Sequence, residues 1–391
     1  MIETLEVNED TLQYTTEDER RPRLDALRKA MDETGHDALV IVGRGDARFR
    51  GRVFYVSDIL EVSGDTFVVM PRDGEMRFIT TPVVGLARAR LTTWITDRRM
   101  SATPGVEVGR ALAELGLDRG QIGIVGMKDA IALGHFEELR NELPHASLTD
   151  ATPTFEHVRR VKSPDEIENL RETSAAFRKV FTAIEAELRP GITERDILAE
   201  ATRIARIYGC RDVKAAISTT PFRAVGYGSD RRIGRDDIVM IWIESPGRSG
   251  YWLEFRRCYS FGPPPNDVVE FWTRQVEATQ AALAVMKPGA RASAVVEAVD
   301  LALGGGDFWC GEPDSTYALH GIGTDAIEGF VYPADNVSLL ENEVVSYHPS
   351  VKFADERQAL RLRFIGMTDN ILIAADGAER LTYETDTFVE L

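Results

Sequence analysis

The chain of 391 residues has few cysteines and no long apolar run. Its three cysteines, Cys210, Cys258 and Cys310, are odd in number and widely spaced, without a CxxC pair. This pattern excludes a disulfide scaffold or zinc ribbon and predicts reduced thiols in a cytoplasmic protein. No apolar run approaches the roughly 18 residues of a membrane-spanning helix. The polar start MIETLEVNEDTLQYTTEDERR lacks the apolar core of a signal peptide.

Positive charge is also in the minority. The 46 lysines and arginines stand against 63 aspartates and glutamates, which gives a net charge of −17. A nucleic-acid-binding surface needs a basic patch, and an anionic membrane attracts basic segments, so we expect neither partner. The surplus acid is interpreted as a solubility feature, because net charge says little about function.

What the sequence does contain is an alternation of helical and strand-like segments. Residues 1–20 are predicted to form an N-terminal arm. Strand-like runs such as Ala38–Val42 and Gln121–Gly126 then alternate with amphipathic helices, which predicts a small α/β domain over residues 21–155. A larger domain is predicted over residues 156–391.

The larger domain is predicted to open with a long helix. Ser163-Pro164-Asp165-Glu166 is a capping box with proline at the first helical position, and the helical pattern runs to about Leu188. Two Pro-Gly turns, at 190–191 and 288–289, each join a pair of helices. Each pair is followed by apolar strands, at 238–243 and 250–261 and then at 344–349 and 362–374. The repetition predicts a pseudo-twofold domain; chance recurrence of a common turn is the alternative.

Four motifs in this half resemble a known superfamily. They are RPGITERDILAEA, GRDDIVMIWIESPGRSGYWLEFRRCYSFG, LHGIGTDAIEGF, and LLENEVVSYHPSVKF followed by GMTDNILIAADGAERLT. In order and spacing they are similar to the creatinase, prolidase and aminopeptidase P superfamily, whose peptidases are of the M24 type. The resemblance implies an α/β (α+β) fold with a small creatinase-type N-terminal domain followed by a pita-bread domain. It also implies a homodimer in which the partner's N-terminal domain closes the active site.

The resemblance also implies where the active site lies. The peptidases of the superfamily hold two divalent ions with two aspartates, one histidine and two glutamates. The matching positions here are Glu244 (at best), Glu254, His320, His348 and Thr368. About two of the four carboxylates are lost, so we expect no metal and no other cofactor. The sequence is closer to the metal-free branch, with creatinase and ectoine hydrolase, whose enzymes hydrolyse C–N bonds in small polar nitrogen compounds.

The leading hypothesis is therefore a metal-independent hydrolase of a small amide, amidine or cyclic amidine. Glu254 would act as base or nucleophile, with His320 and His348 in proton transfer. The structural alternatives are an ion pair of Glu254 with Arg256 or Arg257, and a core position for His348.

Further site residues are predicted beside this group. Glu328 keeps the glutamate of the family's His-Glu pair and is a catalytic candidate. The substrate-binding candidates, each of which could instead pack or form a surface ion pair, are Tyr227, Tyr251, Trp252, Ile327 and Arg363. Tyr227 stands where creatinase has a further histidine, so creatine is not the predicted substrate.

Two other functions remain open. Glu254, His320 and His348 form the two-histidine, one-carboxylate ligand set of mononuclear non-haem iron sites, which would allow a lyase, decarboxylase or hydrolase with a single ion. Alternatively, the lost ligands could mark a catalytically dead domain that binds peptides or proteins. Metal content distinguishes the first of these from the metal-independent hypothesis.

Overall fold

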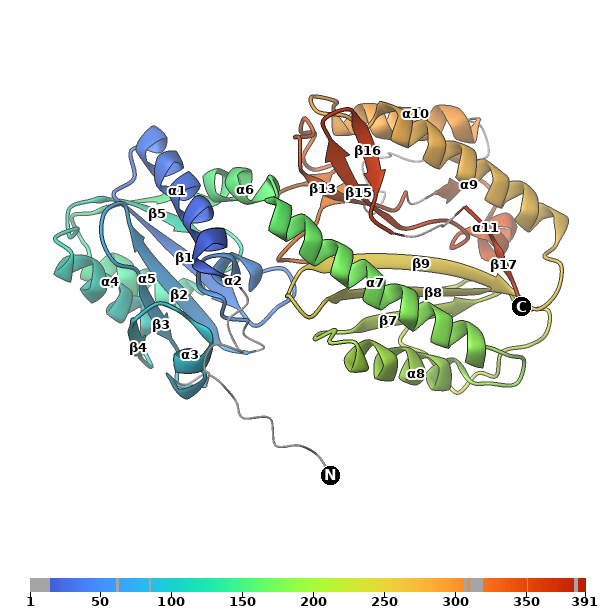
Figure 1. Ribbon diagram of the computed structural model, residues 1–391, viewed down its shortest axis with the longest axis horizontal. Helices are drawn as coiled ribbons and strands as arrows, with labels where there is room; N and C mark the ends of the chain where they lie inside the picture. The colour runs from blue at the N-terminus through green and yellow to red at the C-terminus, as the bar shows by residue number, and fades with distance from the viewer. Residues whose placement is uncertain are drawn as a thin grey trace. The chain divides into compact units, whose positions relative to one another are not determined.

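The computed structural model describes residues 15–60, 63–83, 86–304, 308–309, 319–349, 351–382 and 386–391. The chain divides into two compact units, Met1–Arg159 and Arg160–Leu391, which are described separately (Figure 1). Within the described ranges, no helix is both long enough and apolar enough to cross a membrane. Cys210 and Cys258 are buried free thiols, and Cys310 lies outside the described residues.

The first unit is built on one six-stranded sheet in the order β4-β3-β2-β1-β5-β6. The strands are β1 (Ala38–Arg44), β2 (Asp65–Pro71), β3 (Arg77–Thr80), β4 (Asp97–Met100), β5 (Gln121–Val125) and β6 (Ser147–Asp150). The helices are α1 (Glu17–Thr34), α2 (Gly51–Ser57), α3 (Leu86–Thr92), α4 (Pro104–Glu114), α5 (Leu133–Glu142) and α6 (Thr152–Arg160). Arg72-Asp73-Gly74, a sequence typical of a hairpin turn, joins β2 to β3, with Gly74 at a φ of 105°.

Both faces of this sheet are covered. Along β1, Leu39 and Ile41 belong to one buried cluster, whereas Val40 and Val42 belong to another. Because side chains alternate along a strand, the continuous apolar run of β1 supplies a core on each side of the sheet. This arrangement explains why the strand has no polar alternation.

The predicted N-terminal arm is too long. Helix α1 begins at Glu17, with Thr16 as its N-cap: the Thr16 hydroxyl accepts from the Glu19 amide, and the Glu19 carboxylate accepts from the Thr16 amide. The sequence-based boundary at residue 20 overlooked this capping box. Residues 1–14 of the predicted arm lie outside the described residues.

The second unit repeats one pattern twice, as predicted. Helices α7 (Pro164–Glu187) and α8 (Glu194–Ile207) precede the strands β7 (Lys214–Thr219), β8 (Val239–Pro246) and β9 (Trp252–Ser260). Together with β17 (Val389–Glu390), these strands form a sheet in the order β17-β9-β8-β7. Helices α9 (Asn266–Val285) and α10 (Ala292–Leu303) then precede a sheet in the order β12-β11-β13-β15-β16. Its strands are β11 (Leu319–Gly321), β12 (Val331–Tyr332), β13 (Val344–Tyr347), β15 (Asp369–Ala374) and β16 (Gly377–Arg380).

The two sheets of this unit meet where β9 runs beside β15. Arg256 and Thr368 form an isolated β-bridge, and the Asn370 side-chain amide donates to the Glu254 carbonyl oxygen at 2.6 Å. The junction brings Glu254 of the first sheet close to the second sheet, which carries His320. The fold is therefore of the predicted class, a small α/β unit followed by a larger α/β unit with an internal repeat.

One predicted strand is partly wrong. The segment 362–374 is a strand only from Asp369, and residues Glu356–Leu362 form the short helix α11 between β14 (Lys352–Phe353) and β15. Asp355 caps α11 by accepting from the Arg357 amide at 2.9 Å. Arg361 consequently lies in α11, and Arg363 follows its last residue. Arg361 pairs with Asp267 at 2.6 Å, and Arg363 pairs with Glu356 at 2.5 Å.

Candidate active site

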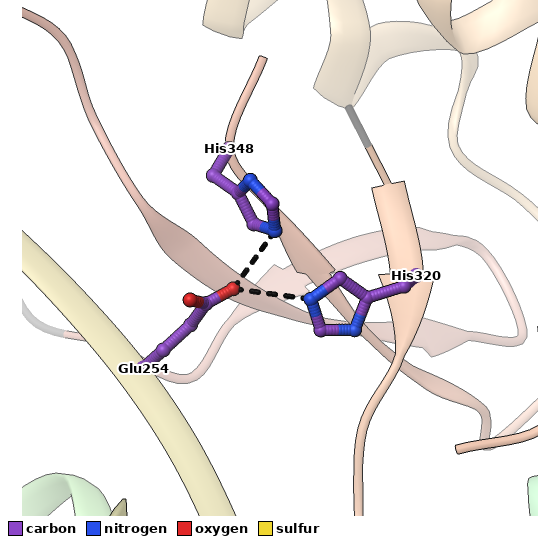
Figure 2. Close-up of side chains that lie close together, drawn as sticks. All are labelled: Glu254, His320 and His348. Atoms are coloured by element: carbon purple, nitrogen blue, oxygen red, sulfur yellow. Dashed lines mark ion pairs between the residues drawn. The ribbon is translucent and has the colours of Figure 1, made fainter. Parts of the chain in front are cut away.

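Three side chains that are far apart in sequence converge in the second unit. Glu254 lies on β9, His320 lies on β11 and His348 directly follows β13. The Glu254 Oε1 atom is 3.0 Å from His348 Nε2 and 3.3 Å from His320 Nε2. Figure 2 marks both contacts with dashed lines. One donor atom from each residue lies within 4.8 Å of the others. These three residues are called the Glu-His-His cluster below.

Strand register explains the convergence. His320 stands opposite Ser346 in the antiparallel β11–β13 pair. His348 lies two residues beyond Ser346, and residues two apart share a face of an extended chain. Glu254 reaches the same place from β9, where it stands opposite Glu244 of β8. The site is thus assembled at the junction of the two repeats.

The cluster carboxylate is held by further hydrogen bonds. The Trp242 indole donates through Nε1 to Glu254 Oε2 at 3.0 Å, and the Ser346 hydroxyl donates to Glu254 Oε1. His320 Nδ1 lies 2.9 Å from the Gly321 carbonyl oxygen, which can only accept. That contact places a proton on Nδ1, and Nε2 is the ring nitrogen that faces Glu254.

Burial and charge shape the protonation of the site. Burial alone would raise the pKa of Glu254, but the charges and hydrogen bonds of His348 and His320 outweigh it and hold that pKa well below its usual range. Burial lowers the pKa of His320, but its hydrogen bond to Glu254 prevails and raises it overall. Across the strand pair, burial and the charge of Glu254 raise the pKa of Glu244, although Lys214 contacts it at 3.0 Å.

A cavity of about 810 Å³ opens onto the cluster. Its remaining wall is mostly apolar, and among the lining residues are Met240, Trp242, Ile327, Val351, Phe353, Phe364 and Ile365. Glu244, Arg256, Arg363 and Thr368 also line it. A largely apolar hollow with a few converging polar groups is the usual form of a small-molecule site.

Two of the predicted substrate-binding residues line this cavity, and three do not. Ile327 and Arg363 lie in its wall. Tyr227 is 85% exposed and lines a different surface hollow beside α8. Tyr251 is buried and donates to Glu166 at 2.9 Å, and Trp252 is fully buried, with Lys214 Nζ 5.1 Å from its ring centroid.

The predicted catalytic Glu328 is not part of the cavity wall. It is buried and forms an ion pair with the buried Lys162. Its other oxygen accepts from the amide and the hydroxyl of Thr324 at 2.8 and 3.0 Å. These contacts hold together the loop that follows His320.

The proposed ion pair of Glu254 with a neighbouring arginine is wrong. Arg257 pairs with Glu185 at 3.0 Å, and Arg256 donates to the Met367 carbonyl oxygen at 2.7 Å. Asp369, beside the cavity-lining Thr368, forms an ion pair with Arg380. Burial raises its pKa to about 7 despite that cation, and it does not supply a missing carboxylate to the cluster.

Sequence reasoning missed Ser346 and Trp242, the two donors to Glu254. Both stand two residues before a residue already singled out, Ser346 before His348 and Trp242 before Glu244. The strand period of two would have placed them on the same faces. It would not have shown that both side chains reach the same carboxylate.

Comparison with known proteins identifies the two halves. The model of the metallopeptidase family M24 matches residues 168–375, and that of the creatinase/prolidase N-terminal domain matches residues 23–161. A protein named "Probable dipeptidase PepE" from Mycobacterium tuberculosis is 29% identical over 233 residues, which are 58% of this chain and 60% of the relative. The match thus spans less than two thirds of that relative's length.

Two further proteins show the breadth of the similarity. The ectoine hydrolase of Halomonas elongata is 25% identical over 298 residues, which are 68% of this chain and 69% of the relative. The solved structure of an Xaa-Pro dipeptidase from Bacillus anthracis has a TM-score of 0.76 and 19% identity, and the match covers 95% of this chain and 100% of that one. At such identity, the structural match shows the pita-bread fold alone.

These findings correct the leading sequence-based hypothesis. The predicted metal-independent hydrolase is wrong, because the matching family is one of metallopeptidases and its relatives here include dipeptidases. In addition, the Glu-His-His cluster has the residue types and spacing of a metal site. The expectation of lost metal binding counted the missing carboxylates and gave too little weight to two imidazoles as ligands. With its family model matching more than half of its residues, the chain belongs to the metallopeptidase family M24, preceded by a creatinase/prolidase N-terminal domain.

Proposed function

We propose that this protein is a metal-dependent hydrolase that cleaves an amide bond of a small substrate with a single divalent transition-metal ion. The observation that carries the proposal is the Glu-His-His cluster, whose three donor atoms lie within 4.8 Å of one another at a cavity of about 810 Å³. The sequence left open an enzyme that uses a single metal ion as a lyase, decarboxylase or hydrolase, and the proposal is the hydrolase among these. Dipeptides are the first substrates to test, since two of the similar proteins are named as dipeptidases.

The donor set fits such an ion. Two imidazoles and one carboxylate are the protein ligands of many catalytic zinc sites, which leave one position open for water or substrate. Metal–ligand distances of ~2.0–2.1 Å in a tetrahedral site separate neighbouring donor atoms by about 3.3 Å. In the cluster, Glu254 Oε1 lies 3.0 Å from His348 Nε2 and 3.3 Å from His320 Nε2. Bound there, the ion would act as a Lewis acid and lower the pKa of water.

The surrounding residues would keep the ligands in place. Trp242 and Ser346 each donate to one oxygen of Glu254, which restrains both the position and the rotation of the carboxylate. The Gly321 carbonyl oxygen fixes the proton of His320 on Nδ1, so Nε2 is available as a ligand. Such outer contacts typically change metal affinity or activity by ~10–100-fold.

In this proposal, Glu244 carries out the proton transfer. It lines the cavity, stands across the strand pair from Glu254 and is held by Lys214 at 3.0 Å. Because burial raises its pKa, it is a better proton acceptor than an ordinary surface glutamate. We propose that Glu244 accepts a proton from the attacking water and returns it to the leaving amine.

The homodimer and the cytoplasmic location implied by the sequence remain proposals. Light scattering on the purified chain would give the oligomeric state. A second copy is not needed for the cluster itself, because all three of its residues lie in the second unit of one chain.

The test is hydrolysis of a dipeptide panel before and after exhaustive chelation, followed by readdition of Zn²⁺, Mn²⁺ or Co²⁺. We expect chelation to abolish hydrolysis and one of the ions to restore it. We expect His348→Ala to lower kcat/KM by at least ~10³-fold. His145→Ala, at an exposed histidine of the first unit, is the matched control. Undiminished hydrolysis by the chelated protein would contradict the proposal.

A further inference from the structure

Arg256 is one of three basic residues that line the described wall of the cavity, with Lys352 and Arg363. It stands on β9 two residues after Glu254 and lines the same cavity. Within the described part of the chain, no carboxylate lies within salt-bridge distance of its guanidinium. Arg363, also in the cavity wall, is by contrast neutralised by Glu356 at 2.5 Å.

The guanidinium also has hydrogen-bonding capacity to spare. Its one hydrogen bond to the described residues runs from Nη2 to the Met367 carbonyl oxygen at 2.7 Å, and the buried Nε makes none. A half-buried guanidinium is costly to leave without a counter-charge. The planar fork of Nε and Nη donors matches a carboxylate in two parallel hydrogen bonds.

The spacing relative to the cluster defines what kind of carboxylate would fit. Residues two apart on a strand share a face and lie ~7 Å apart. An amino acid places its carboxylate one residue from the amide on its nitrogen, which suits a carboxylate at Arg256 and an amide at the cluster. Met240, Phe364 and Ile365 provide an apolar wall of the same cavity.

From these observations, and resting on the proposed function, we propose that Arg256 binds the free carboxylate of the substrate. The protein would then select amides of an apolar amino acid with an unblocked carboxyl group, such as free dipeptides or N-acyl amino acids. Dipeptide amides and longer peptides, which lack a carboxylate at that position, would be poor substrates.

The test measures binding separately from catalysis. Isothermal titration calorimetry on the metal-free protein compares N-acetyl-L-leucine with N-acetyl-L-leucinamide, which differ in the carboxylate. We expect the acid to bind ~10–100-fold more tightly, the value of a charge-assisted bidentate contact. Arg256→Met should abolish this preference, and Arg256→Lys, which keeps the charge without the fork, should retain part of it.

A neighbouring arginine supplies the matched control. Arg257 stands next on β9 and pairs with Glu185, and it does not line the cavity. Arg257→Met should leave the preference for the acid unchanged, with circular dichroism confirming that each variant is folded. Equal binding of acid and amide, a preference that survives in Arg256→Met, or no binding of the acid up to ~10 mM would overturn the inference.

Hydrolysis assays then separate this inference from the proposed function. If the metal-loaded protein hydrolyses free dipeptides and their C-terminal amides at equal kcat/KM, Arg256 does not select the substrate although the hydrolase proposal stands. If nothing is hydrolysed but the acid still binds through Arg256, the proposed function fails and the binding site stands.

Discussion

The two units each bury a carboxylate between two cationic or basic side chains, but with different outcomes. In the first unit, Glu156 lies between Arg52 at 2.8 Å and Arg159 at 2.7 Å, and Arg52 also contacts Asp129 at 2.7 Å. In the second unit, Glu254 lies between two imidazoles at the wall of a cavity. Both carboxylates have a lowered pKa, to about 2 for Glu156 and well below the usual range for Glu254.

The difference lies in the partners and in the space beside them. Guanidinium groups stay protonated and cannot bind a metal, so they neutralise Glu156 permanently. Imidazoles can exchange their protons for a metal ion, and the cavity leaves room for a substrate. A buried, strongly ionised carboxylate is therefore a structural feature in one unit and a candidate catalytic group in the other.

The largest expected stability effect is in the structural cluster. Glu156→Gln would remove the buried carboxylate that contacts both Arg52 and Arg159, and we expect it to lower the free energy of unfolding by ~3–5 kcal/mol. Urea denaturation measures this, with Glu137→Gln at an exposed glutamate as control. A loss below about 1 kcal/mol would show that the cluster is not the structural ion pair described above.

Asp58, a second buried carboxylate of the first unit, sharpens the comparison, because its contact with an arginine is longer than the two arginine contacts of Glu156. Asp58 is buried, accepts from the Thr15 hydroxyl at 2.8 Å and has Arg20 at 3.6 Å. Burial raises its pKa to about 6. Since this pKa exceeds the unfolded value, the native state binds the proton more tightly, and stability is lost as the pH rises from about 4 through 6.

Asp58→Asn should therefore remove this loss. We expect the variant to be more stable than the natural chain by about 2 kcal/mol at pH 7 and not at pH 4. Asparagine also tolerates the left-handed backbone at this position, where φ is 62°. Thermal or urea unfolding at both pH values measures the difference, and the exposed Asp73→Asn is the control. The same gain at pH 4 and pH 7 would contradict the assigned titration.

A smaller effect tests how the Glu-His-His cluster is supported. Ser346→Ala removes one donor to Glu254 without touching a proposed ligand, and we expect metal affinity to fall by ~10–100-fold. Ser174→Ala removes an equally buried hydroxyl, bonded to the Leu381 carbonyl oxygen at 2.7 Å, and should leave metal affinity unchanged. Equal affinity in both variants would mean that Ser346 does not position the ligand.

Much of the fold followed from local signals, and the failures have local causes as well. The capping box at Ser163, the β2–β3 hairpin and the repeated helix pairs depend on near neighbours in sequence, so the pattern predicted them. The strand predicted over 362–374 began too early, because the short helix α11, capped by Asp355, ends at Leu362 and β15 begins only at Asp369. Short helices give too few residues for period alone to decide.

The site also has one part that the sequence predicts and another that only the structure shows. The motifs identified Glu254, His320 and His348, and the structure brings them together. Which groups face them depends on side-chain contacts between distant strands, so the sequence could not predict the hydrogen bond from Ser346 to Glu254 or the absence of a carboxylate beside Arg256 among the described residues. Tyr227 was chosen because it stands where creatinase has a further histidine, and it lies on the surface away from the cavity.

The most direct test of the central claim is the number of transition-metal ions per chain. Mass spectrometry of the protein after reloading and removal of free metal would be compared with Glu254→Gln, His320→Ala and His348→Ala. We predict about one equivalent in the natural chain and less than about a tenth in each variant. Substoichiometric metal in the natural chain, or full binding in the variants, would contradict a single ion held by Glu254, His320 and His348.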